Sequence, residues 1–72
     1  MVKILRFDSM RFDLKASTLL FFVGNKMGLR VNLKESSNGI YETLSVDNYP
    51  KTTWFSYCFN DKTNGIKVEL GE

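Results

Sequence analysis

The sequence feature that most constrains the fold is an alternation of apolar and polar residues on both sides of the dipeptide Asn38-Gly39. Apolar residues occupy every second position through residues 29–34, and Ile40, Leu44 and Val46 alternate with Tyr41, Thr43 and Ser45 after the dipeptide. A period of two indicates half-buried strands, and Asn-Gly between two such runs is a strong signal for a hairpin with a two-residue type I′ turn. The pattern therefore predicts an antiparallel hairpin at this place.

A two-residue turn fixes the register of this hairpin. It sets Val31 opposite Val46 and Leu33 opposite Leu44, so that one face is apolar. The other face then carries the polar pairs Arg30–Asp47, Asn32–Ser45 and Lys34–Thr43. A like-charged pair, Glu35–Glu42, lies near the tip. A slip of one residue would move every side chain to the opposite face, so the pattern and the turn together predict this register.

A second hairpin is predicted near the C-terminus, with residues 61–64 as its loop. This loop pairs aromatic residues with β-branched and aliphatic ones, which are good sheet-forming pairs. The pairs on one face are Phe59–Ile66, Tyr57–Val68 and Phe55–Leu70, and those on the other are Trp54–Gly71, Ser56–Glu69 and Cys58–Lys67.

A third hairpin is predicted near the N-terminus, with its turn at Asp8-Ser9. It brings Leu5 opposite Phe12, an apolar pair, but it also brings Arg6 opposite Arg11. Like charges at directly opposite positions are unfavourable unless neighbouring carboxylates screen them. These hairpins predict an all-β or β-rich fold in one domain, residues 1–72: a small antiparallel meander of five to seven strands that forms a bent sheet or small barrel.

Residues 16–23 fit more than one structure. A strand that turns back through residues 24–27 would place Leu20 and Phe22 on the apolar face. The remaining apolar residues of the segment, Leu19, Phe21 and Val23, would then lie on the other face. Three structures remain open for this segment. It could be a central strand covered on both faces, or one short helix near residues 16–23 that begins at Ser17. The third is a strand whose second face binds a partner.

The composition argues against catalysis and against metal binding. The 72 residues include no histidine and a single cysteine, Cys58, so neither an internal disulfide nor a zinc site is expected. Histidine is also the commonest general acid–base, and Cys58 lacks one to activate it. We therefore expect no enzyme activity and no cofactor.

The charge and the apolar runs limit the location and the partners. The net charge is +2, and the basic residues are spread along the chain rather than clustered. The longest apolar run, Leu19–Val23, is far shorter than the roughly 20 residues that cross a membrane. With no secretory signal in view, we expect a cytoplasmic protein without a membrane partner.

These observations favour a small, non-enzymatic protein-binding module, and a homodimer is a further expectation because a chain this short has a limited core. The predicted partner-binding residues are Leu19, Phe21, Val23 and Trp54. A short aromatic-rich chain without catalytic residues is typical of the accessory and inhibitor proteins of phages, which act on a host protein.

Two other functions fit the same sequence. The first is binding of single-stranded nucleic acid by a small β-barrel, in which exposed aromatic rings stack on bases beside lysines. The residues that would do so are Tyr49, Lys51, Trp54 and Lys67. The second is a role as a small structural subunit of a larger assembly.

Overall fold

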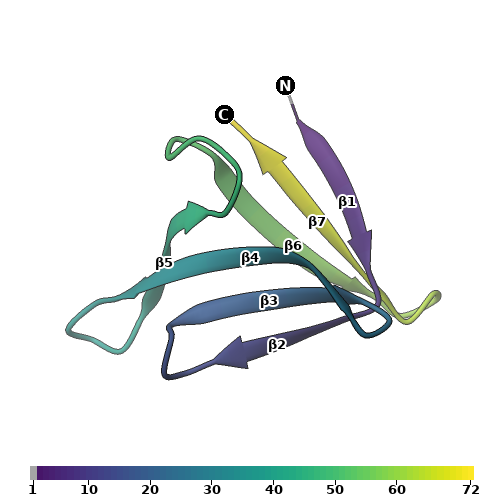
Figure 1. The fold of residues 1–72 in the computed structure, drawn as a ribbon, viewed down its shortest axis with the longest axis horizontal. Helices are drawn as coiled ribbons and strands as arrows, with labels where there is room; N and C mark the ends of the chain where they lie inside the picture. Colours follow the sequence, from purple (N-terminus) through teal and green to yellow (C-terminus); the bar gives the residue numbers. More distant parts are fainter. Residues whose placement is uncertain (1) are drawn as a thin grey trace.

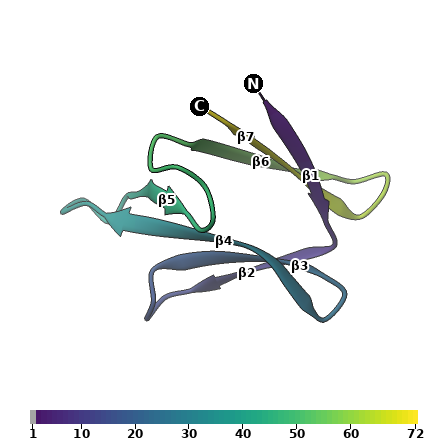
Figure 2. The same cartoon turned by 45° about the horizontal axis from the view of Figure 1, so that its top comes forward.

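The computed structural model describes residues 2–72, which form seven antiparallel strands in two facing sheets (Figures 1 and 2). In the three-stranded sheet the order is β1 (Lys3–Phe7), β7 (Gly65–Gly71) and β6 (Trp54–Asn60). In the four-stranded sheet the order is β2 (Ser9–Asp13), β3 (Thr18–Val23), β4 (Lys26–Glu35) and β5 (Tyr41–Val46). The prediction of a small β-rich fold with five to seven strands is confirmed.

The core lies between the two sheets. Its buried side chains come from both sheets and are Phe7, Phe21, Leu29, Val31, Val46, Ile66, Val68 and Leu70. The strands of the three-stranded sheet run obliquely across the other sheet (Figure 1), so each sheet covers only part of its neighbour. No helix that could cross a membrane occurs within residues 2–72.

The C-terminal hairpin has the predicted register throughout. Phe59, Tyr57 and Phe55 of β6 pair with the core residues Ile66, Val68 and Leu70 of β7, in that order. The short loop leaves little freedom to slip, and a slip would expose the apolar residues of β7 to solvent.

The β4–β5 hairpin has the predicted register only at the end far from its turn. Val31 pairs with Val46 and Asn32 with Ser45, as predicted. The turn itself differs: the Ser36 N–H donates to the Ile40 carbonyl at 2.8 Å, which leaves three loop residues instead of two. Only Gly39 of the loop has a positive φ, 78°, whereas a type I′ turn needs two such residues.

The additional loop residue shifts the pairs near the tip. Leu33 faces Thr43 rather than Leu44, and the predicted pairs Lys34–Thr43 and Glu35–Glu42 are wrong as well. Leu44 is left unpaired as a bulge, which absorbs the shift and restores the predicted register beyond it. The shift also removes the like-charged pair, because Lys34 now faces Glu42.

Residues 18–23 form a strand, β3, and not a helix. Ser17, the expected helix N-cap, has a φ of 52° and ends the turn before this strand. The β3–β4 turn is also shorter than predicted, since Val23 pairs directly with Lys26 and Gly28 forms a bulge. This one-residue slip reverses the predicted faces, so that Phe21 points into the core.

The predicted N-terminal hairpin is wrong. β1 pairs with β7 at the opposite end of the chain, and β2 pairs with β3. Asp8 does not form a turn but joins the two sheets: its N–H donates to the Phe22 carbonyl, and its carboxylate accepts a hydrogen bond from the Gly24 N–H, both at 2.8 Å. This arrangement also separates Arg6 from Arg11, which the hairpin would have placed opposite each other.

Candidate protein-binding groove

Strand β6 is an edge strand with an aromatic inner face. It pairs with β7 on one side only, so within residues 2–72 its other backbone edge has no partner strand. Phe55, Tyr57 and Phe59 point toward the four-stranded sheet, because each lies opposite a core residue of β7. Phe59 is nevertheless 64% exposed and Tyr57 is 40% exposed. The edge of the three-stranded sheet therefore presents aromatic rings to solvent.

These rings form a continuous ladder that begins in the core. The ring of buried Phe21 lies 5.6 Å from that of Phe55 and 5.8 Å from that of Tyr57, measured between centroids. Tyr57 in turn contacts Phe59 at 5.9 Å, edge to face. Spacings of this kind are favourable for aromatic pairs. The core thus extends to the surface along β6 without a polar layer over it.

The opposite wall is the part of the four-stranded sheet that lies beyond β6. Figure 1 shows the β2–β3 and β4–β5 ends of this sheet extending past β6. A hollow of about 440 Å³ lies here, lined by Leu19, Leu33, Tyr41, Thr43, Phe55, Ser56 and Tyr57. A second hollow of about 450 Å³ lies at the C-terminal end of β6 and is lined by residues that include Met10, Phe59, Ile66, Asp8 and Asp61. We call the two hollows together the β6 groove.

Tyr41 closes one end of the β6 groove. Its ring packs edge-on against Phe12 of β2 at 5.3 Å, and its hydroxyl donates to the Glu35 carboxylate at 3.3 Å. Partial desolvation, and then the negative charge and hydrogen bond of Glu35, raise the pKa of Tyr41 above 10.0. The phenol is therefore neutral and acts as a hydrogen-bond donor at physiological pH.

The charges around the β6 groove have one sign. Among residues 2–72, no lysine or arginine lines either hollow, whereas Asp8 and Asp61 line the second one. The other edge strands all carry charged residues: Lys3 and Arg6 in β1, Arg11 and Asp13 in β2, and Glu42 in β5. β6 carries none. Proteins commonly protect exposed edges with charged side chains, so β6 is the unprotected edge of this fold.

The structure separates the predicted patch residues from one another. Leu19 is half-buried and lines the β6 groove. Phe21 lies in the core with no exposed surface, and Val23 is 53% exposed but lines a different hollow, beside Arg6 and Lys67. The face predicted for these three residues was wrong because of the slip at Gly28. Their role in partner binding remains a prediction, and Leu19 is the residue that lies in the groove.

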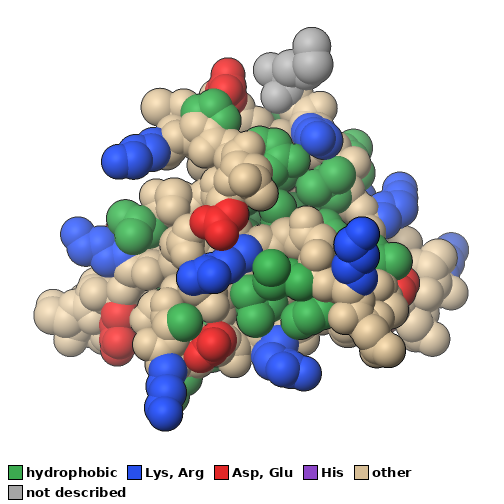
Figure 3. Space-filling view, in the orientation of Figure 1, with side chains coloured by type: hydrophobic (Ala, Val, Ile, Leu, Met, Phe, Trp, Pro, Cys, Tyr) green, Lys and Arg blue, Asp and Glu red, His purple; other side chains and the backbone are tan. Residues whose placement is uncertain are grey.

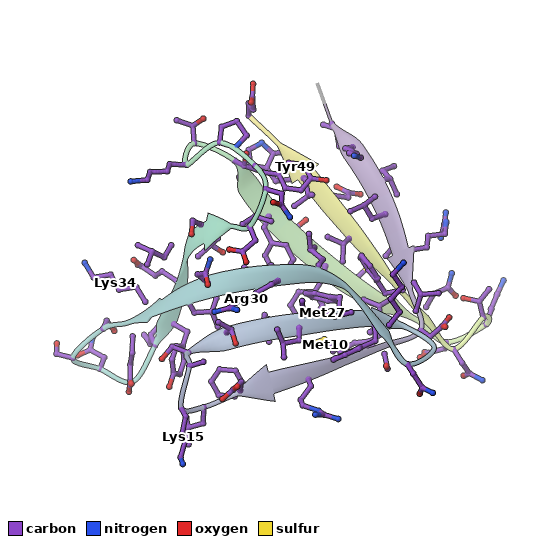
Figure 4. The ribbon with its side chains drawn as sticks, in the orientation of Figure 1. Met10, Lys15, Met27, Arg30, Lys34 and Tyr49 are labelled. Carbon is purple, nitrogen blue, oxygen red and sulfur yellow. The ribbon has the colours of Figure 1, made fainter. Side chains whose placement is uncertain are left out.

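The residues predicted to bind nucleic acid lie in different places. Trp54 and Lys67 are on the outer face of the three-stranded sheet, where the ring of Trp54 covers Gly71 and Lys67 pairs with Glu69 at 3.2 Å. Tyr49 packs against the core from the loop before β6 (Figure 4), and the Lys3 ammonium lies 5.5 Å from the centre of its ring. Lys51 is exposed in the same loop.

The outer face of the four-stranded sheet also carries apolar residues. Phe22 is half-buried beneath the guanidinium of Arg11, which lies 5.7 Å from the centre of its ring. On the side of the molecule shown in Figure 3, apolar side chains gather in separate groups, and lysine and arginine side chains border the central group. These groups are interrupted by charge, unlike the β6 groove.

Sequence reasoning missed Phe12, Tyr41, Tyr57 and Phe59 as surface residues of one site. Two of them, Tyr57 and Phe59, were placed on one face of the C-terminal hairpin with Val68 and Ile66, and these pairs are correct. Their exposure follows from the position of β6 at a sheet edge, which depends on the distant pairing of β1 with β7. The available signal was the absence of any charge in the run from Trp54 to Asn60.

Comparison of the chain with protein-family models, with curated proteins and with solved structures finds no match. Within residues 2–72, no three acidic or thiol side chains lie close enough together to hold a metal ion. The site is therefore interpreted from its own geometry.

Proposed function

We propose that this chain is a small, non-enzymatic protein-binding module whose partner docks in the β6 groove. The observation that carries the proposal is an uncharged aromatic edge strand beside an uncovered apolar sheet face. The exposed fractions of Phe12, Tyr57 and Phe59 are 42%, 40% and 64%. At roughly 200 Å² per aromatic side chain, these rings alone leave about 300 Å² of apolar surface in water. This area is at the lower end of the range for the largest apolar patch on a monomer, and such a patch is often functional.

The charges of the groove favour a protein over a nucleic acid as the partner. Single strands are bound where aromatic rings stand beside lysine and arginine, which neutralise the phosphates. In the β6 groove the rings stand beside Asp8 and Asp61 instead. Trp54, the aromatic residue of the alternative proposal, shares the outer sheet face with Lys67, whose charge Glu69 already partly neutralises.

A larger protein in the cytoplasm is the partner class that we continue to expect, as for accessory or inhibitor proteins of phages. A structural subunit of an assembly would use the same groove to hold a neighbouring subunit. Both roles predict that binding depends on the aromatic residues of β6 and not on chemistry performed by the chain.

The test is capture of partners by the immobilised protein, compared between two matched variants. Phe59→Lys places a charge in the groove at a position that is already 64% exposed, so the fold should persist. Ile4→Lys is the control, because Ile4 is a 53% exposed apolar residue on the outer face of β1, across the sheet from β6. Loss of a central aromatic anchor typically costs about 2 kcal/mol or more.

We expect wild type and Ile4→Lys to capture the same protein, and Phe59→Lys to bind it about thirtyfold more weakly. Treatment with nuclease should leave this capture unchanged. If nuclease removed all captured material and Trp54→Ala abolished salt-sensitive binding of single-stranded DNA, the alternative function would replace this one. Equal capture by Phe59→Lys and wild type would place the binding surface elsewhere.

A further inference from the structure

We infer that the β6 groove takes one extended segment of a partner protein, which adds to β6 as a fourth, antiparallel strand of the three-stranded sheet. This inference rests on the proposed function and specifies the partner of the same groove. It follows from the free backbone edge of β6, from the uncovered sheet face beside that edge, and from the charges at the ends of the groove.

The backbone edge supplies the first argument. The seven residues of β6 pair with β7 only, so alternate N–H and C=O groups point away from the sheet without a strand partner. An added strand satisfies these groups, which is how many domains bind extended peptides. The strand contains no charge and no proline that would oppose pairing.

The uncovered sheet face supplies the second argument. The face has four strands, but only three strands lie against it. The next strand position beyond β6 lies over Leu19, Leu33 and Tyr41, which line the hollow beside β6. A segment in this position buries every second side chain against that face, while the intervening side chains lie beside Ser56 and Cys58 on the outer face of β6. The partner segment is therefore apolar at every second position and polar between.

The charges supply the direction and the end of the segment. Asp8 and Asp61 lie at the end of the groove where β6 finishes. An antiparallel segment has its N-terminal end there, so a lysine or arginine at that end complements the carboxylates. Because exposed ion pairs contribute little, this charge sets orientation and adds about two- to fivefold in affinity.

A single segment fits this position better than a second folded copy. Antiparallel pairing of β6 with β6 of another copy requires a two-fold axis perpendicular to the sheet. That axis would place both four-stranded sheets on the same side of the joined sheet. The four-stranded sheet already extends past β6 (Figure 1), so the two copies would compete for the same space.

The experiment is selection from a displayed library of random heptapeptides on the wild-type protein. We expect enriched peptides with apolar residues at alternate positions and a basic residue near the N-terminus. The best peptide should bind Ile4→Lys as it binds wild type and should bind Phe59→Lys about thirtyfold more weakly. Asp61→Lys should remove the preference for the basic residue.

N-methylation of the peptide distinguishes strand addition from other docking. Two versions of the best peptide carry methyl groups on every second backbone nitrogen, one on the odd positions and one on the even positions. Only one edge of the peptide faces β6, so we expect one version to lose binding and the other to keep it. If both versions bind, or if helical patterns are enriched, strand addition is wrong while the protein-binding function stands. Failure to enrich any peptide would also overturn the inference. Concentration-dependent dimers that Phe59→Lys abolishes would overturn it as well, because a second copy would then occupy the groove.

Discussion

Truncation of two phenylalanines in the same aromatic ladder should reduce stability by very different amounts. Phe21 has no exposed surface, and its ring contacts those of Phe7, Phe55 and Tyr57 within 5.8 Å. Phe21→Ala removes the centre of this cluster and leaves a cavity between the sheets. Such substitutions cost about 3–5 kcal/mol. At the usual 0.05–0.15 kcal/mol per residue, the whole chain is stable by only about 4–11 kcal/mol.

Phe59→Ala is the matched control, because it removes the same atoms from the exposed end of the ladder. Complete burial of a phenylalanine contributes about 1.5–3 kcal/mol, and Phe59 is 64% exposed, so its loss should cost about 1 kcal/mol or less. The introduction of a charge sharpens the contrast: Phe21→Lys should unfold the protein, since a buried unpaired ammonium is very costly.

The measurement is urea unfolding followed by far-ultraviolet circular dichroism, with the free energy of unfolding compared among wild type, Phe21→Ala and Phe59→Ala. We expect Phe21→Ala to lose most of its stability and Phe59→Ala to unfold close to wild type. If Phe21→Lys remained folded, or if the two alanine variants were equally stable, Phe21 would not be the centre of the core. The slip at Gly28 that places Phe21 there would then be wrong as well.

Two further predictions concern individual side chains. Gly28→Ala should destabilise the protein by about 1–3 kcal/mol in the same assay. The reason is that a Cβ at this position would lie 2.7 Å from the ring of buried Phe7. Unchanged stability would contradict the bulge at this residue. Glu35→Gln should lower the pKa of Tyr41 toward 10.0, although not fully, since desolvation is the largest cause of the rise. The stability linked to this phenol is complete below pH 10 and decreases as the pH rises through the raised pKa. Nuclear magnetic resonance titration of the tyrosine ring carbons measures the pKa, and an unchanged value would remove Glu35 as a cause.

Local features of the sequence were sufficient to predict all of one hairpin and part of another. The β6–β7 register follows from a short loop and from pairs of aromatic with aliphatic residues, and it is correct at every predicted position. The distal pairs of the β4–β5 hairpin are also correct. The alternation of apolar residues gave the correct pairs in both places, whereas the predicted loop length is correct only for β6–β7.

The errors arose where a single residue changes the register or where the pairing is distant in sequence. The bulges at Gly28 and Leu44 each insert one residue, and a one-residue change reverses the face of a strand. Sequence periodicity does not distinguish a bulge from a longer turn. The pairing of β1 with β7 joins the two ends of the described chain, and no local signal specifies it.

The location of the candidate site follows from that distant pairing. Once β1 occupies one side of β7, β6 must form the other edge of the three-stranded sheet. The aromatic rings of β6 are therefore partly exposed to solvent, although they point toward the four-stranded sheet. A strand that served the fold alone could carry a lysine at Ser56 or Cys58, which point outward and are already exposed. The other edges carry such charges and β6 does not. An unprotected edge risks aggregation, so its retention beside an uncovered apolar face is best explained by a partner strand that occupies it.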